Sequence, residues 1–334
     1  MEKERTRTHW GARLAAFLAG KATYVVVIAV VLILAARQPF MLSVLNIVSM
    51  LGNATPLLIV SVGVTFVIVS KQLDLSTGSI ALTCASIGGV LMSRLGWNPV
   101  VCLLLYLVIG ALLGLLNGLM IVKLSLHPWL VTLGMQLLLK GFSYTLTQTA
   151  TITLPDSVKV VRSVRVGPVP LFIILALVFT ALMQYVLKYT KFGRYVIAVG
   201  SNREAAERLG MPVGRTRILV MMICGFCCGL SAIMSTINVG SISQYTGRGY
   251  EFLAVTTVVL GGTSMAGGAG SVFPGTLFGV LVISLLENGL SINGVNPYVF
   301  NILRGVIIFA AMLTDTFKER INNAILHNSS ERRV

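Results

Sequence analysis

The sequence has few charged residues. Of its 334 residues, 11% are Asp, Glu, Lys or Arg, while 55% are hydrophobic. A soluble globular domain usually carries about 25% charged residues, so this chain lacks the charge needed to cover a soluble surface. The scarcity excludes an ordinary soluble domain of this length and favours a protein embedded in a lipid bilayer.

Six long runs contain no charged residue at all. A helix needs about 20 mainly apolar residues to cross the hydrocarbon core, where its backbone polar groups must be satisfied within the segment. The continuous runs fit helices and do not fit the alternating pattern of membrane β-strands. The predicted fold class is therefore an all-α, polytopic membrane protein. The runs cover residues 38–70, 75–93, 95–122, 166–187, 218–247 and 252–286.

Ten transmembrane helices are predicted from these runs and their flanks. The stretch 252–288 is too long for one span, and glycines interrupt it between Gly261 and Gly270, so it is assigned two spans. Short strings recur in the two halves of the chain, which leaves a duplicated architecture as an open possibility. The predicted spans lie at 22–36, within 43–69, within 77–94, within 100–122, at 128–147, 169–187 and 218–238, twice within 252–288, and at 297–314.

Basic residues are concentrated in three segments, at 1–21, 188–217 and 316–334. Lys and Arg favour cytoplasmic loops, so the distribution predicts that both termini are cytoplasmic. The predicted organisation is a cytoplasmic N-terminal segment at 1–21, a transmembrane domain at 22–315 with a cytoplasmic loop at 188–217, and a cytoplasmic tail at 316–334. The net charge of +15 is then explained without a nucleic-acid partner.

Signatures of catalysis and of bound cofactors are missing from the sequence. It contains no His-Glu-x-x-His, no Gly-x-Ser-x-Gly, and no Gly-Lys-Ser/Thr after its glycine-rich stretch. All five cysteines lie inside apolar runs, where free Cys behaves as a small hydrophobe, and no βαβ pattern surrounds the Cys224-x-x-Cys227 spacing. The sequence predicts no enzyme, no cofactor and no metal site.

A short amphipathic helix is predicted inside the basic segment 188–217. Ser201 followed by Glu204 is typical of a capping box, and Gly210 followed by Pro212 is typical of a helix end. Such a helix, placed between two spans, is either a projection that a soluble partner grips or an ordinary solvated connector. Its predicted apolar face consists of Ala205, Ala206 and Leu209.

Three segments together resemble the permeases of bacterial ABC importers of the ribose/arabinose/galactose type. Each motif alone is modest, but the three occur in the family's order and spacing over nearly the whole chain. One departure is that the usual glycine after Gly270-Ser271 falls one residue late, at Gly275, behind Phe273-Pro274. The segments are Phe192-Gly193-Arg194 with Ala198–Asn202, Glu204-Ala205-Ala206 and Gly210; Leu73–Ser79; and Gly249–Val272.

The resemblance implies a permease subunit of an ATP-driven importer for a monosaccharide or related polyol. Its partners would be an ABC ATP-binding subunit, a periplasmic sugar-binding protein and a second permease copy or paralogue, in a bacterial inner membrane. The basic segment would dock into the ATPase and transmit its closure to the spans. The coupling residues implied are Gly193, Arg194, Glu204, Ala205, Ala206 and Gly210.

Polar residues inside or beside the spans are candidates for the pathway or its gate. Asp74 with Ser76 fits a polar cap at the start of a membrane helix, where the carboxylate would face the positive end of the helix dipole, and this structural role is favoured over substrate contact. Glu287 is a plausible deep carboxylate. The candidates are Asp74, Ser76, Asn117, Glu287 and Asn288.

Two other transporter classes remain as alternatives. A branched-chain amino-acid ABC permease belongs to a related importer class, but the Leu73-Asp74-Leu75-Ser76 and Glu204-Ala205-Ala206 elements look closer to the sugar group. An ion-coupled secondary transporter would require chained carboxylates or histidines through the bundle, and deep carboxylates are scarce here.

Overall fold

The computed structural model describes residues 32–296 together with 299–300, 302, 305–306 and 309. The described residues fall into two compact units, one at Val44–Ser284 and a smaller one drawn from Met1–Ser43 and Leu285–Val334. Most of the predicted first and tenth spans, and both terminal segments at 1–21 and 316–334, lie outside the described residues.

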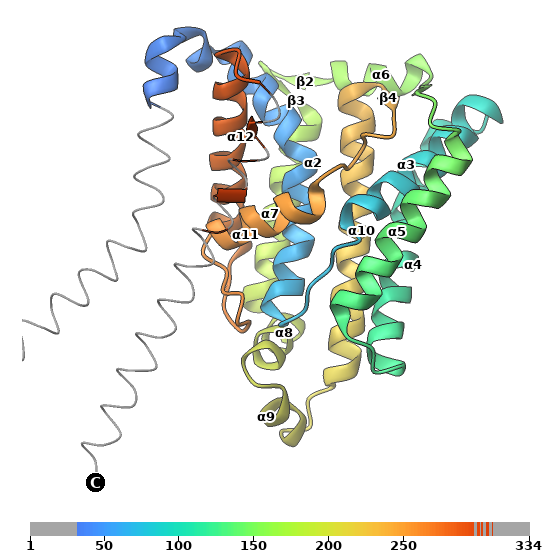
Figure 1. Cartoon of the computed structure of the whole chain (residues 1–334), viewed down its shortest axis with the longest axis vertical. Helices are drawn as coiled ribbons and strands as arrows, with labels where there is room; N and C mark the ends of the chain where they lie inside the picture. The colour runs from blue at the N-terminus through green and yellow to red at the C-terminus, as the bar shows by residue number, and fades with distance from the viewer. Residues whose placement is uncertain (1–31, 297–298, 301, 303–304, 307–308, 310–334) are drawn as a thin grey trace, which may run out of the picture. The chain divides into compact units, whose positions relative to one another are not determined.

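The larger unit is built almost entirely of helices (Figure 1). Its few strands are two residues long and form two antiparallel pairs, β1 (Ile152–Thr153) with β4 (Ser241–Ile242) and β2 (Arg165–Val166) with β3 (Val169–Pro170). The helices are α2 (Val44–Val69), α3 (Thr77–Arg94), α4 (Pro99–Lys123), α5 (Pro128–Thr147), α6 (Asp156–Ser163), α7 (Leu171–Tyr189), α8 (Lys191–Ser201), α9 (Arg203–Arg208), α10 (Val213–Val239), α11 (Tyr250–Leu260), the irregular turn η2 (Val272–Thr276) and α12 (Leu277–Ile292), which continues into the smaller unit.

Five stretches of the described chain are long and apolar enough to cross a membrane: α2, α4, α7, α10 and Val272–Ile292. Helices α3 and α5 form where the third and fifth spans were predicted. The chain is therefore a polytopic α-helical membrane protein, and the count of ten spans stays a prediction.

The predicted eighth span differs from a full crossing. Helix α11 has 11 residues, which at 1.5 Å per residue gives a length of about 16 Å, roughly half the hydrocarbon thickness. The chain then runs through the glycine-rich loop, residues 261–271, before η2 and α12. Two backbone N–H groups at the start of η2, those of Val272 and Phe273, are satisfied by the side-chain oxygen of Gln184 on α7.

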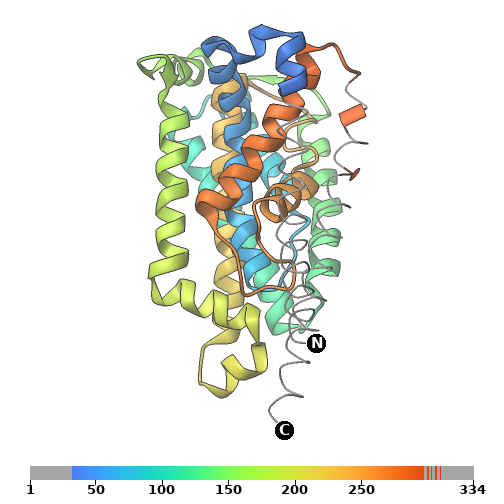
Figure 2. The same cartoon turned by 90° about the vertical axis from the view of Figure 1, so that its left-hand side faces the viewer.

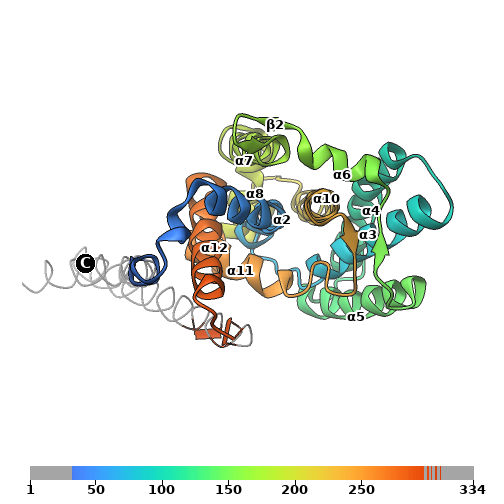
Figure 3. The same cartoon turned by 90° about the horizontal axis from the view of Figure 1, so that it is seen from above.

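Helix α2 is buried along almost its whole length, whereas α4 and α7 expose large apolar side chains. Viewed down the bundle, α2, α3 and α10 lie between α7 on one side and α4 and α5 on the other (Figure 3). Exposed side chains such as Leu104, Val108 and Leu112 on α4 give the bundle an apolar outer surface. Such a surface suits contact with lipid.

Helices α4 and α10 approach each other through glycines. A Cβ on Gly114 would overlap the carbonyl oxygen of Met221, and a Cβ on Gly225 would overlap that of Gly110. Small residues at four-residue spacing allow membrane helices to pack backbone to backbone, where van der Waals contact replaces the hydrophobic driving force. Gly110-xxx-Gly114 and Gly225-xxx-Gly229 carry this spacing in the sequence but were not among the predicted motifs.

Hydroxyl groups connect α2 to its neighbours. Ser61 Oγ lies 2.8 Å from Thr257 Oγ1 of α11, and Thr65 Oγ1 lies 2.7 Å from Thr276 Oγ1 of η2. Hydrogen bonds of this kind between membrane helices contribute about 0.6 kcal/mol each on average. They fix the rotation of α2 relative to α11 and η2, the elements on either side of the glycine-rich loop.

The smaller unit packs Leu34, Ala35 and Met41 against apolar residues near the end of α12, Leu285, Leu290 and Ile292. It includes the short turn η1 (Pro39–Leu42). The candidates Glu287 and Asn288 belong to this unit.

The glycine contact between α4 and α10 predicts a specific sensitivity. Gly114→Ala should destabilise the folded protein by about 1–3 kcal/mol, because the added methyl forces the two helices apart. The matched control is Gly134→Ala on α5, where a Cβ would have nothing within 4 Å. Thermal unfolding in detergent would measure the difference, and equal melting temperatures for the two variants would contradict the packing argument.

Candidate functional site

Helices α8 and α9 project from one end of the larger unit, opposite α6 and the strands (Figure 1). The predicted short helix exists, but its capping residue differs from the prediction. Asn202 caps α9, since its Oδ1 accepts a hydrogen bond from the N–H of Ala205 at 3.0 Å. Ser201 instead ends α8 and donates its hydroxyl to the carbonyl of Ile197. Asn202 takes this place because the chain breaks from helical geometry there and not one residue earlier.

The far end of α9 agrees with the prediction. Gly210 has a left-handed φ of +72°, and its N–H bonds back to the carbonyl of Glu207. A residue in this conformation ends a helix, and glycine adopts it without a steric penalty.

The predicted apolar face of α9 is divided. Ala206 is buried against Val199 and Val213, whereas Leu209 is 75% exposed and Ala205 is also exposed. Glu204 lies on the exposed side as well. One alanine, Ala206, therefore anchors α9, and the rest of the helix is exposed together with Leu209, which directly follows it.

Gly193 lies at the sharp turn from α7 into α8. Thr190 caps α8 by accepting the N–H of Gly193 at 3.1 Å, and a Cβ on Gly193 would overlap the carbonyl oxygens of Val186 and Leu187. Figure 2 shows α8, yellow-green, turning away from the axis of α7 at its lower end. Gly193 is thus buried within the turn, where a side chain would clash, whereas Arg194 beside it is exposed.

Three segments meet at the end of α8 with no side chain between them. The N–H of Gly268, in the glycine-rich loop, donates to the carbonyl of Val69 at 2.8 Å. A Cβ on Gly200 of α8 would overlap that same carbonyl and crowd the N–H of Gly268. The end of α2, the end of α8 and the glycine-rich loop are therefore in backbone contact, which we call the Val69 junction.

The link between α2 and α3, residues 70–76, begins at the Val69 junction. Near its end, Asp74 Oδ1 accepts hydrogen bonds from the backbone N–H of Ser76 at 2.8 Å and from its hydroxyl at 2.5 Å. Asn117 of α4 donates to the same hydroxyl at 2.9 Å. All three side chains are at most 1% exposed. The structure thus brings Asp74, Ser76 and Asn117 together in one buried network that holds the start of α3.

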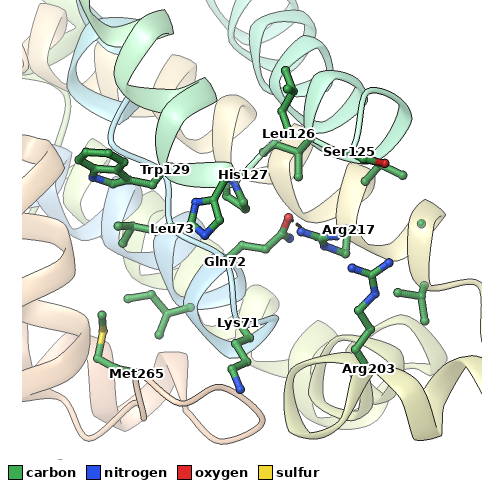
Figure 4. Close-up of a pocket in the computed structure, with 16 residues that line it drawn as sticks. Lys71, Gln72, Leu73, Ser125, Leu126, His127, Trp129, Arg203, Arg217 and Met265 are labelled. Carbon is green, nitrogen blue, oxygen red and sulfur yellow. Dashed lines mark hydrogen bonds between the residues drawn. The ribbon is translucent and has the colours of Figure 1, made fainter.

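A cavity lined by described residues opens at the end of the unit where α8 and α9 lie. Its volume is about 740 Å³, and Figure 4 shows polar and basic side chains around it. Arg217 of α10 donates to the side-chain oxygen of Gln72 at 3.2 Å across one wall. We call it the lower cavity; its lining includes Lys71, Gln72, Leu73, Ser125, His127, Trp129, Arg203, Arg217 and Met265.

A second cavity of about 360 Å³, the upper cavity, lies beside the first turns of α3. Its lining is rich in hydroxyl, amide and cationic groups. It is formed by Gly78, Leu82, Lys140, Tyr144, Gln244, Tyr245, Thr246, Gly247 and Arg248.

Both cavities are lined by the same two parts of the chain, the segment from the end of α2 into α3 and helix α5. Residues 71–73 line the lower cavity, and Gly78 with Leu82 line the upper one; on α5, Trp129 lines the lower cavity and Lys140 the upper one. The buried Asp74 network occupies the chain between them. A closed polar segment therefore lies between the lower cavity and the upper cavity.

A second polar contact lies on the α5 side of this closed segment. Gln136 donates to Glu251 Oε1 at 2.9 Å, and Lys140 Nζ lies 3.6 Å from the same oxygen. Glu251 lies in the first turn of α11 and is 6% exposed. Its other oxygen lies near the position a Cβ would take on Gly78, in the first turn of α3, where a carboxylate is favoured by the positive end of the helix.

Sequence reasoning missed several residues of this arrangement. Gln136 could have been found as the one amide side chain on the mainly apolar helix α5, and Gly200 as a glycine inside the Ala198–Asn202 motif. Glu287 and Asn288, in contrast, belong to the smaller unit and line neither cavity.

The sequence was compared with known proteins. A profile of the family described as branched-chain amino acid transport system / permease component matches residues 46–312. The chain belongs to this permease family. No solved structure matches it.

Individual members of this permease family extend over most of the chain. The ribose import permease protein of Escherichia coli strain K12 is 32% identical over 315 residues, 91% of this chain and 96% of that protein. The fructose import permease protein of Rhizobium meliloti is 31% identical, over 79% of this chain and 75% of its own. The galactose/methyl galactoside import permease protein of Escherichia coli strain K12 is 29% identical, over 88% and 93%. The resemblance to sugar importer permeases is confirmed.

The two cavities predict a pattern of thiol accessibility. A water-soluble maleimide should label Thr246→Cys in the upper cavity and Ser125→Cys in the lower one, but not Ser76→Cys, whose side chain is buried between them. All five native cysteines are buried, so the unmodified protein gives a low background. Rapid labelling at residue 76 in the purified protein would show that the segment between the cavities is open.

Proposed function

We propose that the chain is the permease subunit of an ATP-driven importer for a monosaccharide or a related polyol. The observation that carries the proposal is a pair of cavities separated by a closed link that starts at the Val69 junction. Relatives named as import permeases for ribose, fructose and galactose support the choice of substrate class.

In this proposal the sugar passes from the upper cavity to the lower one. Tyr144, Gln244, Tyr245 and Thr246 in the upper cavity offer hydroxyl, amide and aromatic groups, which suit the hydroxyls and the apolar faces of a sugar. The passage opens when the segment from Asp74 to Ser76 moves away from Asn117. Asp74, Ser76 and Asn117 thus act as a gate and not as a lasting binding site.

The same proposal assigns α8 and α9 to energy coupling. Arg194, Glu204, Ala205 and Leu209 are exposed and available to a partner, whereas Gly193 and Ala206 fix the helices to the bundle. A push on α9 would reach α8, then the Val69 junction, and from there the gate. Gly210 contributes by ending α9 at the right residue.

Further partners and the orientation belong to this proposal. The ABC ATP-binding subunit would dock at α8 and α9 in the cytoplasm, and a periplasmic sugar-binding protein would dock at the end that carries α6. Both termini would be cytoplasmic, with ten spans in a bacterial inner membrane. A second permease copy or a paralogue would complete the pathway.

Reconstitution tests the function directly. Proteoliposomes containing the chain, its ATPase and its sugar-binding protein should take up labelled ribose, fructose or galactose only when ATP is present. Uptake driven by an ion gradient without ATP would support a secondary transporter instead. ATP-dependent uptake of leucine but of no sugar would support the branched-chain amino-acid alternative.

The Val69 junction predicts an uncoupling substitution. Gly200→Ala should abolish most ATP-driven uptake while ATP hydrolysis continues, because the added methyl separates α8 from the end of α2. Uptake and hydrolysis would be measured in the same proteoliposomes. Ser201→Ala, one residue further on an exposed position, is the matched control and should transport normally. Normal coupling in Gly200→Ala would contradict the proposed route.

A further inference from the structure

The lower cavity concentrates positive charge that passage of a neutral sugar does not require. Lys71, Arg203 and Arg217 line it, and none of the described residues that line it is Asp or Glu. Glu207 contacts Arg203 from outside the lining at 3.0 Å, but both side chains are about half exposed or more, so this pair neutralises little of the charge.

The guanidinium group of Arg203 points toward Arg217, whereas that of Arg217 points toward Gln72 (Figure 4). Arg217 is held in place because its Nε donates to Gln72, whose own Nε2 donates to Ser70 at 3.0 Å. The Nε bond leaves the two terminal nitrogens of the Arg217 fork for other acceptors. Like charges placed this close repel each other, and a shared anion would remove the repulsion.

The backbone around the cavity is unusual as well. Lys71 and Ser125 have left-handed φ values of +58° and +53°, and they are two of the four non-glycine residues with positive φ in the described chain. Strained backbone conformations of this kind gather at ligand sites, where the surrounding structure imposes them. Both residues line the lower cavity.

We propose that the lower cavity binds a phosphate-bearing anion. Guanidinium forks bind phosphate oxygens in pairs, and a lysine adds a mobile point charge. A volume of about 740 Å³ falls within the range of small-molecule sites and leaves room for an organic group attached to the phosphate. The apolar surfaces of Leu126, Trp129 and Met265 lie ready to contact that group.

Two sources share this chemistry: a soluble phosphate ester, such as a phosphorylated sugar, and the headgroup of an anionic phospholipid. The site rests on its own geometry and does not depend on the proposed transport function.

Trp129 gives a direct measurement. In a variant with Trp10→Phe and Trp97→Phe, Trp129 is the only tryptophan. In detergent, its fluorescence emission should change with increasing glycerol 3-phosphate until the site is saturated. In nanodiscs, its emission should differ between phosphatidylcholine and phosphatidylglycerol. Glycerol with sodium chloride at matched ionic strength is the reference. The soluble probe identifies an ester site and the nanodisc response a lipid site.

Arg217→Gln should weaken the response about tenfold or more, since a charged hydrogen bond is lost. Arg215→Gln, on the same helix but exposed and outside the lining, should leave it unchanged. Lys71→Gln, at an exposed residue, should weaken the response without disturbing the hydrogen bond between Arg217 and Gln72. The proposal is overturned if neither probe changes the emission, if Arg215→Gln acts as strongly as Arg217→Gln, or if Arg217→Gln alters only association with an ATPase.

Discussion

The backbone contact at the end of α2 ties together the parts of the larger unit that are otherwise separate in sequence. The Val69 carbonyl accepts the N–H of Gly268 and lies directly against Gly200. No side chain intervenes, so a displacement of any one of the three segments cannot be absorbed by a change of rotamer. The link to α3 begins at the next residue, which places the closed segment between the cavities within reach of α8.

The other helices of the larger unit are packed rigidly enough to transmit a displacement of that contact. In lipid, apolar burial does not drive one helix against another, and close packing and interhelical hydrogen bonds take its place. The glycines of α4 and α10 supply the packing, and Ser61 and Thr65 supply hydrogen bonds from α2. Helices joined this closely move as rigid bodies.

Few charged side chains are buried in the described part of the larger unit. Glu251 is buried beside Gln136 and Lys140 at the start of α3, where the helix dipole also favours it. The lower cavity, in contrast, gathers cationic groups around Arg217. A neutral substrate could pass both without a change of protonation, whereas an anion would be held at the lower one.

The sequence by itself determined the membrane-spanning class, the positions of most helices and the family. These follow from local properties: charge-free runs set where helices can cross, and Gly210 ends α9 because the φ there is positive. Only the tertiary structure decided that Ser76 and Asn117, 41 residues apart, share one buried network, and that α11 is about half a span. The contact of Val69 with Gly268 at the Val69 junction was likewise not predictable from the sequence pattern. Contacts between backbones distant in sequence leave only a glycine as their mark, and a glycine alone does not name its partner.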